Sequence, residues 1–409
     1  MTEDEAFLQD ILASPDDDAP RLVYADWLED HGDPDRAAFI RVQCELAKLE
    51  EWNERWDGLK EREQRALRGC CKEWLGGVER LVHKWQFRRG FLDSADVRPK
   101  DLVASGEELF RRVPLRHVRL SGNFGEPAVR ALAASPHLAK VRSLELGFDR
   151  LTSAGAAALA GSPCLRGLRE LKLFYCWIGA EGVRALAASP HLARLTTLRL
   201  PFCDIGTAGA VALAASPHLA RLERLDLQDN DIRNEGARAL ARSPHLTHLT
   251  DLNLGSNRLS VAAVQALAES PTLRPSRLDL CGNMLGEKGA RALVGPPGGA
   301  RLTGLRFDCL GSPGVKALAR SPRLANLTAL DLSFGHFGDD GARALAASPH
   351  LARLVELSLY LCGVSDAGAQ AVLGSPHLTR LRRVDLRRNE LGRKQKALWR
   401  ARLGKNVSF

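Results

Sequence analysis

One short phrase, serine followed by proline, recurs at a fixed interval along this chain of 409 residues. The interval is 27 residues over six copies, at Ser135, Ser162, Ser189, Ser216, Ser243 and Ser270. Three more copies follow at Ser321, Ser348 and Ser375, and the 51 residues from Ser270 to Ser321 are two periods less three. A repeat of about 20 to 50 residues is typical of a solenoid or array, so the chain is expected to fold as a stack of similar units.

Each unit has two halves with different periodicity. The first half reads L-x-x-L-x-L, as in LRELKL and LERLDL, and this alternation indicates a short strand with one buried face. The second half, as in EGVRALAAS, places apolar residues at helical spacing, with acids such as Glu181 and Glu235 in the first turn. Connections of this strand–helix–strand type are right-handed. The sequence therefore predicts an α/β fold, a right-handed β-α superhelix of about eleven repeats with a parallel sheet inside and helices outside.

The strand pattern continues into a turn as L-x-x-L-x-L-x-x-N/C-x-I/L. The N/C position holds Asn230, Asn257, Asn283, Asn389, Cys176, Cys203 and Cys362. From about Leu115 to Leu391, with eleven strand cores from residues 118–120 to 384–386, the chain resembles leucine-rich repeats of the ribonuclease-inhibitor type. The resemblance implies that each Asn or Cys side chain bonds the backbone of its turn, so these cysteines are structural. The repeat at Leu305 lacks this residue, and we expect a local kink or loosened turn there.

A histidine follows Ser-Pro in most repeats, for example at His191, His218 and His350. Proline disfavours helical geometry in the residue before it, so Ser-Pro ends each helix at the same place. A histidine at the carboxyl end of a helix can donate to unpaired carbonyls. Equivalent residues of a regular stack lie about 5 to 10 Å apart, too far to share a zinc ion about 2 Å from each ligand. We interpret the histidine as punctuation rather than as a metal or catalytic site.

Residues 1–112 lack the repeat. Thr2 and Glu5 form a capping-box pattern, and Asp18 opens a second helix. The cluster from Asp16 to Asp18 lacks the spaced ligands of a calcium loop, and helix capping explains it. The predicted apolar face of this helical hairpin includes Leu22, Trp27, Leu28, Phe39 and Ile40.

Two elements in about residues 1–45 are specific, D-x-P-R-L-x-Y-A-D-W-L-E and R-A-x-F-I-R-x-Q. They are similar to the repeat-companion domain, a short bacterial domain found in front of otherwise different repeat proteins. No activity follows from that resemblance.

The chain is predicted to contain four parts. Residues 1–45 form the all-α companion module, 46–112 a helical connector and cap, 113–394 the solenoid, and 395–409 a basic cap or tail in which Leu398 and Trp399 pack on the last repeat. Within the connector, residues 46–85 read as helical, 91–97 as a strand and 102–112 as a helix. The net charge of +9 is polarised, because residues 1–35 carry twelve acids and one base, whereas 380–405 carry eleven bases and two acids.

The motifs of enzymes are missing from the sequence. No phosphate-binding loop, dinucleotide fingerprint, zinc-protease helix or nucleophile elbow occurs, and period-locked residues do not supply the unlike groups of a catalytic site. We expect no catalytic activity, cofactor or metal. The nine cysteines include no C-x-x-C pair, the first residues are acidic where a secretory signal would be basic, and no apolar run reaches a membrane span. These features predict a cytoplasmic, monomeric protein without a membrane segment.

The residue between the two leucines of each strand core is expected on the concave side of the sheet. These residues carry mixed charge, which suits a protein surface better than a polyanion: Arg119, Glu145, Lys172, Arg199, Asp226, Asn253, Asp279, Arg306, Asp331, Ser358 and Asp385. Aromatic residues follow the strands of three neighbouring repeats, and aromatics grouped with Arg and Lys are typical of interface hot spots. The predicted anchor for an unidentified protein partner is Phe148, Lys172, Phe174, Tyr175, Trp177, Arg199 and Phe202.

An alternative function is binding of nucleic acid or another polyanion by the basic segment 380–405 and its one aromatic residue, Trp399.

Overall fold

The computed structural model describes residues 2–409 apart from 51–52, 71, 123, 148–150 and 296–301. It divides into two compact units. The first unit comprises residues 1–150 and 158–172, and the second comprises 151–157 and 173–409. Each unit is described below by itself.

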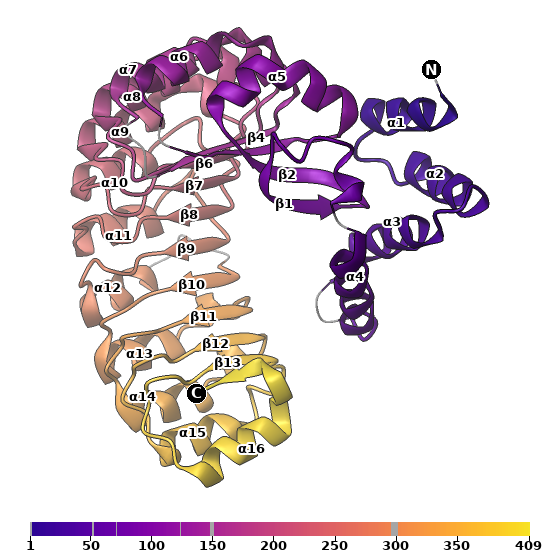
Figure 1. Ribbon diagram of the computed structural model, residues 1–409. Helices are drawn as coiled ribbons and strands as arrows, with labels where there is room; N and C mark the ends of the chain where they lie inside the picture. Colours follow the sequence, from indigo (N-terminus) through magenta and orange to yellow (C-terminus); the bar gives the residue numbers. More distant parts are fainter. Residues whose placement is uncertain (1, 51–52, 71, 123, 148–150, 296–301) are drawn as a thin grey trace. The chain divides into compact units, whose positions relative to one another are not determined.

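The first unit begins with four helices, α1 (Glu3–Ala13), α2 (Ala19–Asp30), α3 (Pro34–Leu46) and α4 (Trp56–Cys70) (Figure 1). The predicted capping box is present, because Thr2 Oγ1 accepts from the Glu5 N–H at 3.2 Å and the Glu5 carboxylate accepts from the Thr2 N–H at 2.9 Å. Asp18 precedes α2 but makes no capping bond with its side chain. Asp17 caps instead, through the Ala19 N–H at 3.0 Å, while Asp18 pairs with Lys48 at 3.0 Å.

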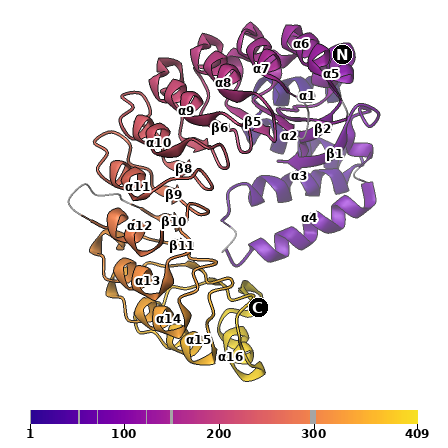
Figure 2. The ribbon, with the colours of Figure 1, turned by 90° about the vertical axis from the view of Figure 1, so that its left-hand side faces the viewer.

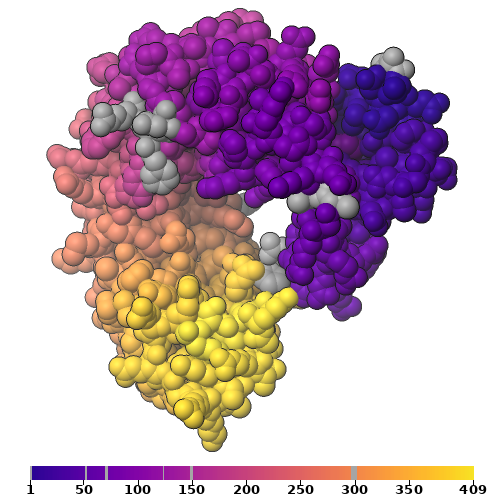
Figure 3. Space-filling view, in the orientation of Figure 1, coloured from indigo at the N-terminus to yellow at the C-terminus, as the bar shows by residue number. Residues whose placement is uncertain are grey.

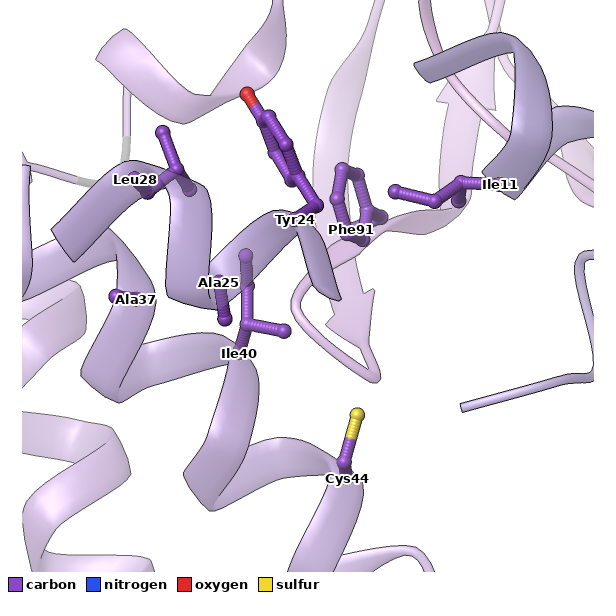
Figure 4. Packing of buried hydrophobic residues seen from close by; sticks show 8 residues of the cluster. All are labelled: Ile11, Tyr24, Ala25, Leu28, Ala37, Ile40, Cys44 and Phe91. Atoms are coloured by element: carbon purple, nitrogen blue, oxygen red, sulfur yellow. The ribbon is translucent and has the colours of Figure 1, made fainter. Parts of the chain in front are cut away.

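Helices α1, α2 and α3 share a hydrophobic core with one residue of a later strand. Of the predicted apolar face, Leu28, Phe39 and Ile40 are buried, and Leu22 and Trp27 pack partly buried against the cluster. Figure 4 shows the ring of Phe91 among the helical residues of this cluster. The members drawn are Ile11, Tyr24, Ala25, Leu28, Ala37, Ile40, Cys44 and Phe91.

Two residues of the specific N-terminal elements tie loops together. The buried Arg21 guanidinium donates to the carbonyls of Asp17 and Pro15 at 2.6 and 2.8 Å, which fixes the turn between α1 and α2. Gln43 is also buried, and it accepts from the Gly90 N–H at 2.7 Å and donates to the Phe87 carbonyl at 3.2 Å. These residues therefore have a structural role.

A β-hairpin follows the helices. The chain continues as a short 3-10 turn, η1 (Glu73–Leu75), then β1 (His83–Arg88), β2 (Phe91–Val97) and α5 (Pro99–Arg112). The predicted strand over 91–97 and the helix over 102–112 are confirmed. The prediction of helix up to residue 85 is wrong, because alternation in HKWQFR places Trp85 and Phe87 on a half-buried face and leaves their neighbours exposed. Arg89 and Gly90 have φ of 52° and 84°, which is the signature of a type I′ hairpin turn.

The first repeats lie in the same unit. They contain β3 (His117–Leu120), α6 (Glu126–Ala134), η2 (Pro136–Lys140), β4 (Ser143–Gly147) and η3 (Pro163–Gly167). Strand β2 is antiparallel to β1 and parallel to β3, which in turn is parallel to β4. The hairpin therefore supplies the first paired strand for the repeats of this unit. In sequence, α7 (Ser153–Ala160) and β5 (Glu170–Phe174) fall across the boundaries of the two units.

The described part of the second unit repeats a strand followed by a helix. Its strands are β6 (Thr197–Arg199), β7 (Arg224–Asp226), β8 (Asp251–Asn253), β9 (Arg277–Asp279), β10 (Gly304–Arg306), β11 (Ala329–Asp331), β12 (Glu356–Ser358) and β13 (Arg383–Asp385). Its helices are α8 (Gly179–Ala188), α9 (Gly206–Ala215), α10 (Arg233–Ala241), α11 (Val261–Ala268), α12 (Gly286–Leu293), α13 (Gly311–Ala319), α14 (Gly338–Ala346) and α15 (Asp366–Leu373). In Figure 2 these helices follow one another along the outer side of the strands.

The strands of the second unit pair in parallel and in chain order. Leu198, Leu225 and Leu252 are register partners one period apart, and the register continues through the shortened repeats, where Leu278 pairs with Leu305 and Leu305 with Leu330. The kink expected at Leu305 does not appear in the strand pairing. In the described part of the chain β3 to β13 are the eleven predicted strands, so the predicted α/β superhelix with an N-terminal helical module is confirmed.

The asparagine and cysteine side chains bond the turns as expected. Asn230 donates to the Leu200 carbonyl at 2.6 Å and accepts from the Cys203 N–H at 3.0 Å, one repeat earlier. Cys203 donates its thiol to the Leu173 carbonyl at 3.2 Å, and Cys362 donates to Leu332 at the same distance. Each such side chain thus links its own turn to the preceding repeat.

Serine hydroxyls join the ends of successive helices. The buried Ser243 hydroxyl donates to the carbonyl of Ala214 at 2.5 Å, which is the penultimate residue of the helix one repeat earlier. The same contact is made by Ser162, Ser216, Ser270, Ser348 and Ser375. The Ser-Pro pattern predicted the end of each helix but not this bond between successive repeats.

The C-terminal segment closes the second unit with a helix and a strand. These are α16 (Arg393–Leu403) and β14 (Val407–Ser408), which is parallel to β13. Trp399 is fully buried, as predicted, whereas Leu398 is exposed. Figure 3 shows this segment in yellow at the surface of the unit. Among the described residues, no helix has the length and apolar character needed to span a membrane.

Candidate functional site

The side chains of the strands that point away from the helices form a surface that we call the open face. In the second unit the predicted column lies on it, because each member is partly exposed between two buried leucines or their equivalents. Register pairing places Arg199 beside Asp226, Asp226 beside Asn253, and Asn253 beside Asp279. The predicted orientation of these residues is confirmed.

Acidic and amide residues of this column also hold the turns. One carboxylate oxygen of Asp226 accepts from the Gln228 N–H at 3.1 Å, and Asn253 accepts from the Gly255 N–H at 2.9 Å. The same bond to the residue two positions later is made by Asp279, Asp331 and Asp385. Sequence reasoning missed this role, although the signal was present, because Asx turns bond two residues forward.

On the open face of the second unit, Arg306 forms ion pairs with acidic neighbours, whereas Asp226 lies near other acids. Arg306 pairs with Asp279 at 2.6 Å and with Asp331 at 3.1 Å. Burial raises the pKa of Asp226, and the nearby charges of Asp279 and Asp251 raise it further. The hydrogen bond from the Gln228 N–H and the charge of Arg199 act in the opposite direction, and the net shift is upward.

Two of the predicted anchor residues form one aromatic stack. The rings of Tyr175 and Phe202 lie 4.3 Å apart between centroids and are inclined by only 8°. Both residues follow a strand and have left-handed backbone, with φ of 55° and 57°, and the Tyr175 N–H donates to the Pro201 carbonyl at 3.2 Å. Tyr175 is 45% exposed, so the stack presents an aromatic surface to solvent.

The other predicted anchor residues are distributed differently. Phe174 and Arg199 are half-buried, and Trp177 is 73% exposed. Lys172 belongs to the first unit, where it pairs with Glu170 at 3.0 Å and lines a polar hollow of about 430 Å³ on the open face. Phe148 lies outside the described residues. The structure thus brings Tyr175 and Phe202 together and assigns Lys172 to a separate feature.

A second aromatic cluster was missed by sequence reasoning. Phe334 and Tyr360 meet edge to face with centroids 5.2 Å apart, and the Arg387 guanidinium lies 5.5 Å from the Tyr360 ring centroid. Phe334 has φ of 60° and occupies the same turn position as Phe202 in a later repeat. That shared position was the available signal.

Three basic residues of the C-terminal segment make contacts within the fold. Arg402 donates to the carbonyls of Leu373 and Leu378 at 2.5 and 3.0 Å, and Lys396 and Arg400 lie over the ring of Phe409. Because Trp399 is buried, its ring is not available to stack on a base.

The buried cysteines have the environment of structural residues. Burial raises the pKa of Cys203 and of Cys362 to about 12, so both thiols stay protonated near neutral pH and can donate to their carbonyls. A protonated thiol is neither the nucleophile nor the metal ligand that a thiolate would be. Within the described residues, His, Cys, Asp and Glu form no group of three or more that could hold a metal ion.

Comparison with known proteins identifies the repeats. The family model described as "Leucine Rich repeat" matches residues 166–187, 191–214, 218–241, 245–268 and 323–346. The chain therefore contains leucine-rich repeats. None of the curated proteins matches the sequence.

Two solved structures are similar in part. A yeast structure described as the Rad7 and Elc1 complex is 15% identical, with 94% of each chain covered and a TM-score of 0.48. A protein from Bacteroides fragilis is 12% identical, with 74% of this chain and 76% of that chain covered and a TM-score of 0.37.

Proposed function

We propose that the protein is a non-enzymatic scaffold that binds a protein partner on the open face of its leucine-rich repeats. The predicted anchor comprises Phe148, Lys172, Phe174, Tyr175, Trp177, Arg199 and Phe202. The observation that carries this proposal is the exposed stack of Tyr175 on Phe202. Exposed aromatic groups near cationic side chains are the usual energetic centres of protein interfaces.

The backbone at the stack supports a binding role. A left-handed conformation costs a bulky L-residue about 1 to 2 kcal/mol. The equivalent turn positions of the next repeats hold Asp229, Ser256 and Gly282, which have φ of 54°, 54° and 74°. The turn therefore forms without an aromatic residue. Tyr175 and Phe202 are costly for the backbone and add little buried core, which favours selection for an intermolecular contact.

The regularity of the open face supports a scaffold rather than an enzyme. A catalytic site needs unlike groups that converge on one reacting atom. Five of the seven column residues from Asp226 to Asp385 instead make the same turn bond. We propose accordingly that the chain has no catalytic activity and uses no cofactor.

Binding of nucleic acid by residues 380–405 is the second candidate. Its support is the surplus of nine positive charges in that segment. The internal engagement of Arg402 and the burial of Trp399 weigh against it. If this segment bound phosphate backbones, affinity for DNA or RNA would fall steeply with salt, and no binding at about 50 mM salt would remove the candidate.

Three finer assignments also belong to the proposal. The repeats are of the ribonuclease-inhibitor type, supported by the bonds of Asn230 and Cys203 to neighbouring turns. Residues 1–45 are a repeat-companion domain, supported by the packing of their specific elements, and the protein is bacterial on that basis. It works as a monomer in the cytoplasm, supported by the reduced, thiol form of the described cysteines.

Affinity capture from the native cell tests the proposal. The bait is the full chain, beside a Phe174→Ala/Tyr175→Ala/Phe202→Ala variant and a control variant, Val211→Ala/Leu398→Ala, which removes exposed apolar side chains away from the open face. We expect the wild type and the control to capture the same protein and the triple variant to lose it. If the folded triple variant kept every partner, the site would be wrong. If nucleic acid alone co-purified, the second candidate would replace the first.

A further inference from the structure

The first unit carries the hollow that Lys172 lines, and the hairpin strand β1 forms one of its walls. Lys84, Gln86 and Arg88 of β1 line it together with residues of β2, β3, β4 and β5. All three side chains are exposed, whereas Trp85 and Phe87, on the opposite face of β1, are half-buried. Phe87 contacts Phe39 edge to face at 5.5 Å between centroids. The aromatic face thus fixes β1 on α3 and turns its polar face to the hollow.

An irregularity in β1 sets the direction of Lys84. His83 pairs with Asp96 and Gln86 with Ser94, so β1 contains one more residue than β2 over this stretch. Lys84 lies in that bulge and has φ of 41°. Bulges of this kind redirect side chains and occur often beside binding sites.

The acids of the hollow are already matched by bases. Asp96 is buried and accepts from Arg119 at 2.6 Å, while Asp93 lies 3.6 Å from Arg116 and 3.5 Å from His117. Glu145 is 3.9 Å from Arg119. Each carboxylate lining the hollow therefore has a cationic neighbour within the unit.

Two cations remain after this pairing. Within the described residues, neither Lys84 nor Arg88 forms an ion pair, and both are exposed on the same edge of the hollow. The charge of Arg88 contributes to the lowered pKa of Asp16, whose largest cause is its hydrogen bond with Arg116 at 2.9 Å. The surplus on this edge is positive, and its two charges lie four residues apart along one strand.

We propose that this hollow binds an acidic, extended segment of a protein partner, whose Asp or Glu side chains pair with Lys84 and Arg88. An extended segment places alternate side chains on one face, and this spacing matches the alternation of Lys84, Gln86 and Arg88. Complementary charge of this kind gives specificity and speeds association. The site goes beyond the aromatic anchor, since its two selecting residues, Lys84 and Arg88, lie on β1 and act by charge.

A peptide-binding measurement tests the inference on the full chain. The probe is a fluorescein-labelled octapeptide of alternating Glu and Ser, and its reference is the same peptide with Gln in place of Glu. We expect the Glu peptide alone to raise the fluorescence anisotropy at about 50 mM salt, with weaker binding at about 300 mM salt. No binding of the Glu peptide, or equal binding of both peptides, would overturn the proposal.

Matched variants separate the hollow from the basic C-terminal segment. Lys84→Gln/Arg88→Gln is expected to weaken binding of the Glu peptide about tenfold, and Gln86→Glu to weaken it by adding a like charge. The control, Arg393→Gln/Lys394→Gln, removes the same charge from exposed positions of α16 and is expected to bind as the wild type does. Loss in the control with retention in the β1 variants would contradict the site. Single-stranded DNA serves as a competitor. If it displaced the labelled peptide at a lower concentration of negative charge than the unlabelled Glu peptide does, an acidic polypeptide would be contradicted as the ligand.

This outcome is independent of the affinity capture. If the wild type captured a partner that the aromatic triple variant lost, and the Glu peptide did not bind, the proposal for the hollow would be wrong and the aromatic anchor would remain supported. If peptide binding depended on Lys84 and Arg88 while the aromatic triple variant kept its partner, the hollow would be supported and the aromatic anchor would be wrong.

Discussion

The side-chain carbonyl of Asn257 accepts a hydrogen bond from the backbone N–H of Asn230 at 3.1 Å, although the two residues are 27 positions apart. The same oxygen accepts from the Ile232 N–H at 3.3 Å, and the Asn257 amide donates to the Leu227 and Gly255 carbonyls at 2.8 and 2.9 Å. Asn257 is completely buried. One side chain thus satisfies four backbone groups that water does not reach.

Replacement of Asn257 by leucine should destabilise the second unit strongly. Four buried backbone groups would lose their partner, and we expect a loss of about 3 kcal/mol or more in the free energy of unfolding. Asn257→Cys should cost less, because Cys203 and Cys362 show that a thiol can donate to the strand carbonyl. Urea denaturation followed by circular dichroism measures both. Equal stability of Asn257→Leu and the wild type would refute the structural role.

The serine bond between repeats has a control within the chain. Ser243→Ala removes the bond to the Ala214 carbonyl and should lower stability by about 1 kcal/mol or more. The Ser135 hydroxyl is also buried but has no hydrogen-bond partner among the described residues. Ser135→Ala should therefore be neutral or slightly stabilising. A similar loss for both variants would show that the hydroxyl bond is not the cause.

Gln43 connects helix α3 to the hairpin, and its loss should loosen the first unit. It accepts from the Gly90 N–H and donates to the Phe87 carbonyl and to Glu63. For Gln43→Leu we expect a loss of about 3 kcal/mol, because these groups would be left buried without a partner. Hydrogen exchange should show faster exchange at the Gly90 amide. The exposed Gln86→Leu serves as the control and should change stability by less than about 0.5 kcal/mol.

The raised pKa of Asp226 predicts a pH-dependent effect of Asp226→Asn. Because the folded-state pKa lies above the ordinary 3.8, ionisation of Asp226 destabilises the fold at neutral pH, and this penalty disappears as the pH falls through the folded-state value towards the unfolded one. The introduced asparagine would keep the bond to Gln228, as Asn253 keeps its bond to Gly255 in the next repeat. We expect the variant to be more stable than the wild type at pH 7 and to lose that advantage near pH 4. If Asp226→Asn were less stable than the wild type at pH 7, the predicted destabilisation by the ionised Asp226 carboxylate would be contradicted.

Most of the fold could be predicted from the period of 27 residues. Each repeat must bury its leucines against the next one, and this requirement determines the strand, the helix and the register together. The bonds that the sequence did not reveal depend on which backbone groups meet in space. The reach of Ser243 to Ala214 is an example, since it crosses between helices one repeat apart. The strand β1 was missed because its alternation is short and follows a charged helical stretch.

The candidate site was predicted only in part for a similar reason. Tyr175 and Phe202 occupy equivalent turn positions in adjacent repeats. Their proximity could be predicted because equivalent positions lie side by side in a stack. The hollow beside Lys172 required the bulge at Lys84, which the residue pattern of β1 does not encode.

Photo-crosslinking at the aromatic stack tests the scaffold account most directly. Benzoylphenylalanine introduced at Phe202 keeps an aromatic ring at the site, and the same group at Val211, an exposed position of α9, serves as the control. On irradiation in the native cell, we predict a specific protein adduct from position 202 and none from position 211. Equal adducts from both positions, or an adduct from position 211 alone, would contradict binding on the open face.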